Sequence, residues 1–215
     1  MYLPKDFREE RVPALHEAIR QIALATLVTL GPDGVEASHV PMLIDPEPAP
    51  FGTLRGHLAR ANPQWRRLAA GTQSLAIFLG PETYITPSWY ATKRASGKVV
   101  PTWNYVAVHA YGALRIVDDA AWLLALVTRL TATHEAGRAQ PWAVSDAPAD
   151  YIAGMVKAII GFELPIARLE GKWKMSQNRP AEDRAGVVEG LMRDGSPGQR
   201  AVADIVAGAT PSEKR

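Results

Sequence analysis

Cysteine is absent from this 215-residue sequence. Disulfide bonds, thiolate metal ligands and cysteine nucleophiles are therefore excluded, and a reducing compartment such as the cytoplasm is the expected location. A large charge excess is missing as well, since 24 lysines and arginines nearly balance 22 acidic residues and leave a net charge of +2. Proteins that bind nucleic acids usually carry a clear basic excess or stripe, so direct binding to DNA is not expected.

Long apolar runs are lacking too. The longest, from Ile22 to Leu30, contains threonines and falls far short of the roughly 20 residues that a membrane span needs. The N-terminal MYLPKDFREERV does not read as a secretory signal, so we expect a soluble protein. The histidines show no metal-ligand spacing, and no P-loop or nucleophile elbow occurs. The sequence therefore predicts no metal site and specifies neither hydrolysis nor phosphoryl transfer.

Aromatic and polar side chains are concentrated between Gly80 and Tyr105, in the run GPETYITPSWYATKRASGKVVPTWNY. Aromatic residues that only fill a core usually recur with a period of two or about 3.6. Here they are interleaved with hydroxyls, amides and cations. This mixture suits a ligand with a flat apolar body, a hydrogen-bonding edge and an anionic tail, and a flavin nucleotide is such a ligand.

Hydrophobic periodicity predicts an α+β fold. Helices are expected over residues 6–24, 62–70, 118–135 and 146–161. Strands are expected over 25–30, 35–44, 51–57, 74–79, 83–86, 105–117 and 162–169, with Pro41 marking an edge or a bulge. Short strands followed by grouped helices favour a barrel-like sheet. We expect one domain over residues 1–192 and a flexible tail over 193–215, where glycine, alanine, serine and charge dominate.

Three segments combine polar, cationic and aromatic residues. In the first, HLARANPQW, Asn62 either only caps a helix or shares the helix amides with a phosphate bound by Arg60 and His57. The second pairs Ser88-Trp89-Tyr90 and Lys93 with Thr102-Trp103-Asn104, which could meet across neighbouring strands. The third contains Ser176-Gln177-Asn178 within the cationic run KWKMSQNRP. An ordinary loop or turn is the alternative for the last two.

Together these motifs resemble the PaiB-like family of FMN-binding proteins, which are named as negative transcriptional regulators. The matching segments follow the family's order over residues 1–191: MYLPKDF, ASHVPMLID, GHLARANPQW, FLGPETYITPSWY, GKVVPTWNYVAVHAYG, IIGFELPI and KWKMSQNRP. The resemblance implies a split β-barrel related to pyridoxamine phosphate oxidase-like folds. It also implies a homodimer with FMN at the subunit interface.

The resemblance further implies which residues bind FMN. It places the phosphate around His57, Arg60 and Asn62, with Lys93 nearby. It places the isoalloxazine ring and the ribityl chain against Ser88, Trp89, Tyr90, Thr102, Trp103 and Asn104. It has Ser176, Gln177 and Asn178 closing the site, with the partner subunit as a candidate source. FMN is expected rather than FAD because a single anion site is indicated and the dinucleotide glycine fingerprint is missing.

The expected function is that of a redox-linked or sensory regulator. No helix-turn-helix pattern supports direct contact with DNA, so regulation through a metabolite or a protein partner is open. The alternative is an FMN-dependent oxidoreductase acting on an unknown small substrate, with His39 and His109 as candidate acid–base groups. A haem-binding protein is less favoured because no axial ligand is indicated. Whether the protein is an enzyme is left open.

Overall fold

The computed structural model describes residues 1–68 and 71–209, and the chain forms two compact units. Unit 1 comprises Met1–Leu15, Leu79–Val108 and Glu170–Arg215, and unit 2 comprises His16–Phe78 and His109–Leu169. Four elements run from one unit into the other: α1 (Val12–Ile22), β6 (Gln73–Ile85), β7 (Thr102–Ala113) and β10 (Arg168–Lys174).

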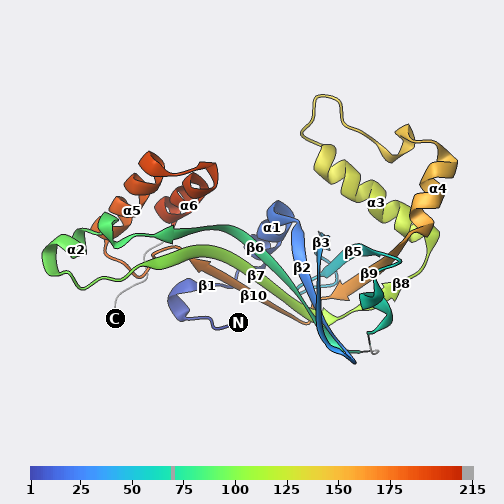
Figure 1. Cartoon of the computed structure of the whole chain (residues 1–215), viewed down its shortest axis with the longest axis horizontal. Helices are drawn as coiled ribbons and strands as arrows, with labels where there is room; N and C mark the ends of the chain where they lie inside the picture. The colour runs from blue at the N-terminus through green and yellow to red at the C-terminus, as the bar shows by residue number, and fades with distance from the viewer. Residues whose placement is uncertain (69–70, 210–215) are drawn as a thin grey trace. The chain divides into compact units, whose positions relative to one another are not determined.

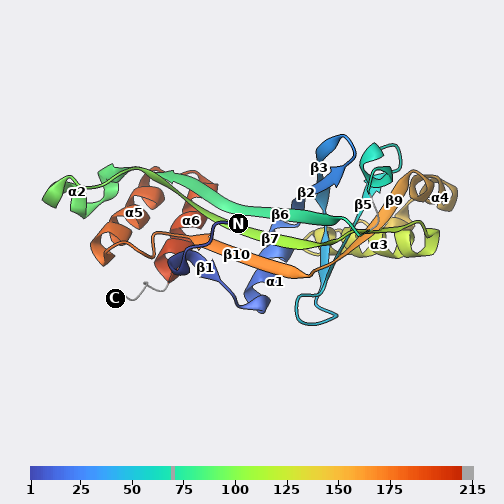
Figure 2. The same ribbon diagram turned by 90° about the horizontal axis from the view of Figure 1, so that it is seen from below.

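Unit 1 is a sheet backed by helices. Its strands follow the order β1-β10-β7-β6, and Figure 2 shows β10, β7 and β6 side by side. The other elements are η1 (Lys5–Phe7), β1 (Arg8–Glu9), η3 (Pro87–Trp89), α2 (Ala91–Ser96), α5 (Ala181–Asp194) and α6 (Pro197–Gly208). Helices α5 and α6 pack against each other (Figure 1).

The core of unit 1 joins the strands to these two helices. Ile85 and Val106 from the sheet pack with apolar residues of α5 and α6. The helical members of this cluster are Val187, Leu191, Val202, Ala203 and Val206. An amphipathic helix of this length draws most of its stability from such burial. The structure therefore places a packed helix, α6, where the sequence predicts a flexible tail from residue 193; residues 210–215 lie outside the described chain.

Unit 2 contains strands of two antiparallel sheets and, in α3, the longest helix among the described residues. One sheet has the order β6-β2-β3, and the other β4-β5-β9-β8. The elements are β2 (Leu24–Gly31), β3 (Gly34–Pro41), β4 (Leu43–Asp45), β5 (Thr53–Ala59), η2 (Pro63–Arg66), β8 (Arg115–Val117), α3 (Ala120–Glu135), η4 (Val144–Asp146), α4 (Ala149–Lys157) and β9 (Ile159–Pro165). Pro41 ends β3, an edge strand of its sheet, as its missing N–H predicts.

Helix α3 agrees closely with its prediction. The Asp119 carboxylate accepts a hydrogen bond from the Trp122 amide at 2.7 Å and so caps the helix. Leu123, Leu126 and Leu130 are buried along one face. The capping residue and the spacing of the apolar residues, both visible in the local sequence, therefore predicted this helix correctly.

Other predicted boundaries were wrong. Strand β6 continues through Gly80-Pro81 instead of splitting there; it pairs with β2 at residues 75–77, so Pro81 lies beyond that ladder and removes no hydrogen bond from it. Ile159 belongs to β9 rather than to a helix, because it pairs with Ala59 of β5. The helix predicted from residue 6 begins at Val12. The one predicted over 62–70 is the short η2, and residues 69–70 lie outside the described chain.

Candidate functional site

A buried hydrogen bond links β7 to the turn that follows β10. The Asn104 amide Nδ2 donates to Ser176 Oγ at 3.0 Å, and the two side chains are 1% and 4% exposed. Ser176 has a φ of 62°, in the left-handed region that serine seldom adopts. Such conformations persist only where the surroundings impose them, and they are concentrated at functional sites. The sequence placed both residues in the predicted flavin site, and the structure brings them into contact.

Lys174 lies beside this pair, although it was not among the predicted site residues. Its ammonium donates to the Trp103 carbonyl at 2.6 Å and to the Thr102 hydroxyl. Burial lowers the pKa of Lys174, and the positive charges of Lys172 and Arg179 lower it further. A detectable signal was the alternation of Lys172 and Lys174 along one strand, which puts both on the same face.

The turn after β10 is held by the Gln177 side chain. Its Oε1 accepts from the Met175 amide at 2.7 Å, and its Nε2 donates to the Trp173 carbonyl at 2.6 Å. Asn178 is exposed. The predicted triplet therefore separates into a buried serine that meets Asn104, a glutamine that closes the turn, and an exposed asparagine.

Tyr90 is fully buried, yet its hydroxyl has no hydrogen-bond partner among the described residues. The Arg179 guanidinium lies 4.7 Å from the centre of its ring. Burial raises the pKa of Tyr90, so the hydroxyl keeps its proton at neutral pH. Since most buried polar groups are hydrogen-bonded, this hydroxyl is a candidate contact for a bound molecule.

Trp89 packs closely against α5. A Cβ at Gly190 would lie 2.4 Å from the indole, so only glycine permits this approach. Nearby, the Lys93 ammonium donates to Ser88 Oγ at 3.1 Å. Ser88 and Trp89 also line a polar pocket of about 540 Å³ over α5. The indole thus has a packing role, whatever it contributes to a ligand.

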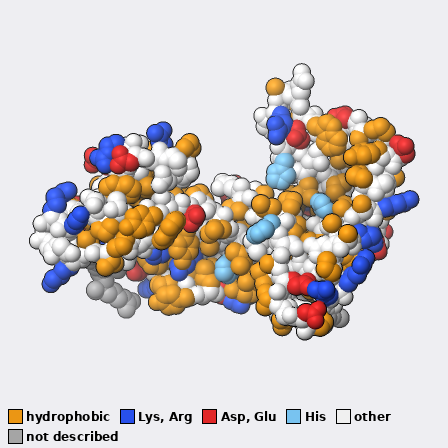
Figure 3. All heavy atoms as spheres, viewed as in Figure 1, with side chains coloured by type: hydrophobic (Ala, Val, Ile, Leu, Met, Phe, Trp, Pro, Cys, Tyr) orange, Lys and Arg blue, Asp and Glu red, His pale blue; other side chains and the backbone are white. Residues whose placement is uncertain are grey.

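Tyr84 and Trp103 form an exposed aromatic pair on β6 and β7. Their ring centres are 6.2 Å apart at an interplanar angle of 72°, and the side chains are 46% and 51% exposed. Figure 3 shows hydrophobic side chains gathered over these strands. This is more exposed apolar area than two isolated surface residues would give, and such patches commonly mark interaction sites.

The residues predicted to hold the phosphate lie in unit 2. Asn62 caps η2 by accepting from the Gln64 amide at 2.9 Å and donates to Ser38 Oγ at 3.0 Å. Arg60 donates to both carboxylate oxygens of Asp118, at 2.9 and 2.6 Å. Asn62 is therefore a capping residue, which both interpretations of this segment expect. The segment that it caps is one short 3-10 turn, which offers fewer free amides than the predicted helix.

His57 projects from β5 in the same unit. Its Nδ1 is buried and has no hydrogen-bond partner among the described residues, and burial lowers the pKa of the ring. A neutral imidazole can donate or accept a hydrogen bond but attracts an anion only weakly. Gln64 was not predicted as a site residue. Its buried side chain accepts a hydrogen bond from the Ser38 hydroxyl and donates one to Thr29 Oγ1, so it holds η2 against the neighbouring strands.

The predicted site residues are divided between the two units. His57, Arg60 and Asn62 belong to unit 2, and the remainder belong to unit 1. His39 and His109 also lie in unit 2, where His39 Nδ1 is 3.1 Å from Thr26 Oγ1. Within residues 1–68 and 71–209 there is no cluster of three or more potential metal ligands. No helix in that part of the chain is long and apolar enough to cross a membrane.

The strands form one six-stranded and one four-stranded antiparallel sheet, and with the helices late in the chain this α+β fold is a split β-barrel. A solved structure with this fold, the FAD and heme binding protein from Mycobacterium smegmatis, has a TM-score of 0.53 and 14% sequence identity, covering 78% of this chain and 73% of that one. Residues 1–168 match the family model described as "Putative FMN-binding domain". The chain belongs to this FMN-binding family, and FMN is its cofactor.

Curated relatives agree with this assignment. An uncharacterized protein of Aspergillus fumigatus is 39% identical, covering 91% of this chain and 92% of its own. The Bacillus subtilis protease synthase and sporulation protein PAI 2 is 29% identical and covers 96% of both chains. The resemblance to the PaiB-like family, the predicted fold and the predicted cofactor are therefore confirmed.

Proposed function

We propose that this protein is an FMN-binding homodimer that acts as a redox-linked or sensory regulator. The observation that supports a sensor is the composition of the cluster around Asn104 and Ser176. It offers amide, hydroxyl and ammonium groups but no histidine among its described residues. The carboxylate of Asp183 nearby accepts a hydrogen bond from the Thr92 amide at 2.9 Å. The other oxygen of that carboxylate is buried without a partner among the described residues, so the set can hold a cofactor with a carboxylate, and no imidazole, as a potential base.

The unit 1 cluster fits FMN chemically. Tyr90 supplies a buried hydroxyl with unused hydrogen-bonding capacity, and Asn104 supplies both a donor and an acceptor for the mixed edge of the ring. Lys174 supplies a positive charge beside them. When bound, FMN supplies reversible one- and two-electron transfer. The residues themselves orient the ring and keep positive charge close to it.

Unit 2 by itself offers a candidate site for a phosphate. The Arg60 guanidinium already grips a planar carboxylate with two parallel hydrogen bonds, the geometry with which arginine also binds phosphate. Asp118 is therefore a competitor that a phosphate would displace. Asn62, with its Nδ2 on Ser38, holds the adjoining turn in place.

The homodimer is proposed from the exposed apolar surface of unit 1. Leu79, Tyr84, Val100 and Trp103 are exposed by 46–65%, and pairing two copies would cover them. Stable homodimers bury more than about 2,000 Å² at the interface. Light scattering at micromolar concentration should therefore give twice the 23.3 kDa chain mass. A monomer mass would contradict this part of the proposal.

The regulatory role is proposed to act without tight binding of the isolated dimer to duplex DNA. The net charge is only +2, and Lys174 is already engaged inside the candidate flavin site. The electrostatic contribution to DNA affinity should therefore be small. Fluorescence-anisotropy titration against genomic fragments, with and without FMN and at two salt concentrations, tests this. Submicromolar, sequence-selective binding that FMN modulates would make the protein a direct repressor.

An FMN-dependent oxidoreductase is the second candidate. It is favoured by Tyr90, whose buried and protonated hydroxyl could donate a proton to a reacting molecule. The experiment is to follow the flavin spectrum of the purified protein while a nicotinamide cofactor is added under air. Continuous consumption of the reductant indicates an enzyme. A flavin that changes redox state without turnover indicates a sensor.

A further inference from the structure

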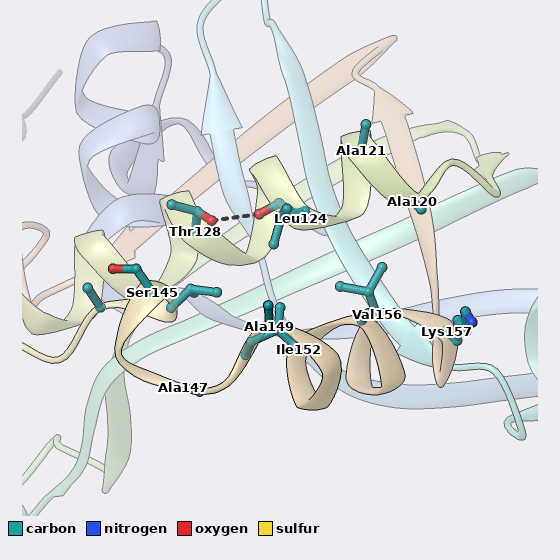
Figure 4. A pocket seen from close by; sticks show the side chains of 13 residues that line it. Ala120, Ala121, Leu124, Thr128, Ser145, Ala147, Ala149, Ile152, Val156 and Lys157 are labelled. Atoms are coloured by element: carbon teal, nitrogen blue, oxygen red, sulfur yellow. Dashed lines mark hydrogen bonds between the residues drawn. The ribbon is translucent and has the colours of Figure 1, made fainter.

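A pocket of about 750 Å³ lies between α3 and α4 in unit 2 (Figure 4). None of the predicted flavin-site residues lines it. Its walls are mainly aliphatic, and its polar side chains are Thr128, Ser145 and Lys157. Pockets that bind small molecules commonly have volumes of roughly 300–1,000 Å³ and mostly apolar walls with a few polar groups. The pocket is thus of the right size and character for a small ligand.

Each helix contributes a regular apolar face to the pocket. On α3, Ala121, Leu124 and Thr128 recur at spacings of three and four, on a different face from the buried Leu123 and Leu126. Leu124 is 41% exposed although it is a large apolar side chain. Helix α3 therefore has a second apolar face that the core of unit 2 does not use.

Helix α4 has a similar apolar face on the other side of the pocket. Ile152, Ala153 and Val156 line the pocket at the same helical spacing, together with Ala149. Figure 4 shows side chains from both helices directed into the space between them. Because alanines make up much of both faces, the side chains are too short to fill the gap. Figure 3 shows hydrophobic side chains exposed over these two helices.

A positively charged side chain, that of Lys157, lies at one end of the pocket. Lys157 is the last residue of α4, and its exposed ammonium makes no ion pair with another described residue. The nearby Asp118 is held by Arg60, whose Nε donates to the Lys157 carbonyl at 2.9 Å. Near the other end, the Asp146 carboxylate accepts from the Ala143 amide at 2.9 Å. Asp146 and Asp150 do not line the pocket, and Lys157 is the charged side chain among its lining residues.

We propose that this pocket binds a small molecule with an apolar body and one anionic group, the body between α3 and α4 and the anion at Lys157. This would be a second ligand site, separate from the FMN-binding residues and independent of whether the protein is a sensor or an enzyme. Because the walls of the pocket are mainly aliphatic, the apolar body of the ligand needs no hydrogen bonds to them. A ring system or short hydrocarbon chain carrying a carboxylate or sulfonate has the matching chemistry.

Two probes separate the apolar contribution from the charge. 1-Anilinonaphthalene-8-sulfonate has an apolar body with an anion, and N-phenyl-1-naphthylamine has nearly the same body without one. Both are titrated into the FMN-loaded protein by fluorescence. Ala121→Leu, which fills the pocket, should weaken both probes by at least about tenfold, since the added side chain takes the ligand's space. Lys157→Gln should weaken only the sulfonate, by about tenfold, as expected for loss of one charge-assisted contact.

Ala125→Leu is the matched control, because Ala125 is an exposed alanine of α3 that does not line the pocket. It should leave both affinities unchanged. Ala153→Leu fills the pocket from α4 and repeats the test should Ala121→Leu fail to fold. Unchanged probe binding in a folded, filled variant would overturn the proposal. A filled variant that loses the dimer mass would also overturn it, by showing that the pocket is an interface between copies. Retained FMN absorbance in all variants would keep this result separate from the proposed flavin function.

Discussion

Asn104 and Ser176 stand 72 positions apart in the sequence, and a hydrogen bond of 3.0 Å between Nδ2 and Oγ joins them inside unit 1. The bond fixes the turn after β10 relative to β7. It does so at a serine whose φ of 62° would be unfavourable without such support. The candidate flavin site therefore depends on a contact that spans much of the chain.

Removing either partner should reveal this dependence. Asn104→Ala and Ser176→Ala each leave a buried polar group unpaired, which costs about 1–3 kcal/mol of unfolding free energy. A double-mutant cycle should show a coupling of roughly 1 kcal/mol, and FMN affinity should fall in both variants. Urea denaturation and flavin titration measure the two effects. Ser96→Ala, at an exposed hydroxyl bonded to the Thr92 carbonyl, should change neither.

Gly190→Ala should destabilise unit 1 because the new methyl would stand 2.4 Å from the Trp89 indole. An extra methyl group in such a tightly packed place typically lowers the free energy of unfolding by about 1–3 kcal/mol. Gly154→Ala is the control, since a Cβ there meets nothing within 4 Å. It should stabilise the protein by roughly 0.5–1 kcal/mol, the usual gain from alanine in a helix. Thermal unfolding of both variants decides whether the contact with Trp89 is as close as described.

The pairing of Arg60 with Asp118 leads to opposite expectations for two variants. Arg60→Ala should weaken FMN binding by about ten- to a hundredfold, as expected for loss of a charge-assisted bond to phosphate. Asp118→Asn should leave FMN affinity unchanged or increase it, because it frees the guanidinium. Isothermal titration with FMN tests both. Equal losses in the two variants would mean that the ion pair is structural and that the phosphate binds elsewhere.

His57 should make stability depend on pH. Burial lowers the pKa of its ring in the folded state, so below about pH 6.5 the unfolded chain binds more protons at this position than the folded chain does. Stability from a neutral His57 is therefore complete above that pH and is lost as the pH falls. The unfolding free energy of the wild type relative to His57→Asn should decrease between about pH 7.5 and about pH 5.5. His57→Phe, which also cannot titrate, should follow His57→Asn; a constant difference would contradict the expectation.

Much of the candidate site could be predicted from sequence because its residues lie in compact motifs. Ser88 and Lys93 are five positions apart and bond to each other, and Thr102, Trp103 and Asn104 are consecutive. Lys174 was left unassigned because its role depends on the Trp103 carbonyl, which the sheet brings to it. The pairing of Arg60 with Asp118, 58 positions away, was equally out of reach of a local pattern.

The helices and strands also differ in how far the local sequence predicted them. Asp119 and the apolar face that follows it were enough to define α3, because a cap and a helical period act within a few residues. Gly80-Pro81 reads locally as a turn, yet β6 runs through it, since neighbouring strands outweigh a local turn preference. Helix α6 has local start signals that the prediction missed, the Ser196 and Gln199 capping box and Pro197 at its first position, and burial of Val202 and Val206 in the core of unit 1 stabilises it further. Short-range preferences thus set the type of element and the family motifs, while burial and strand pairing, which join distant residues, set where elements end and which side chains meet.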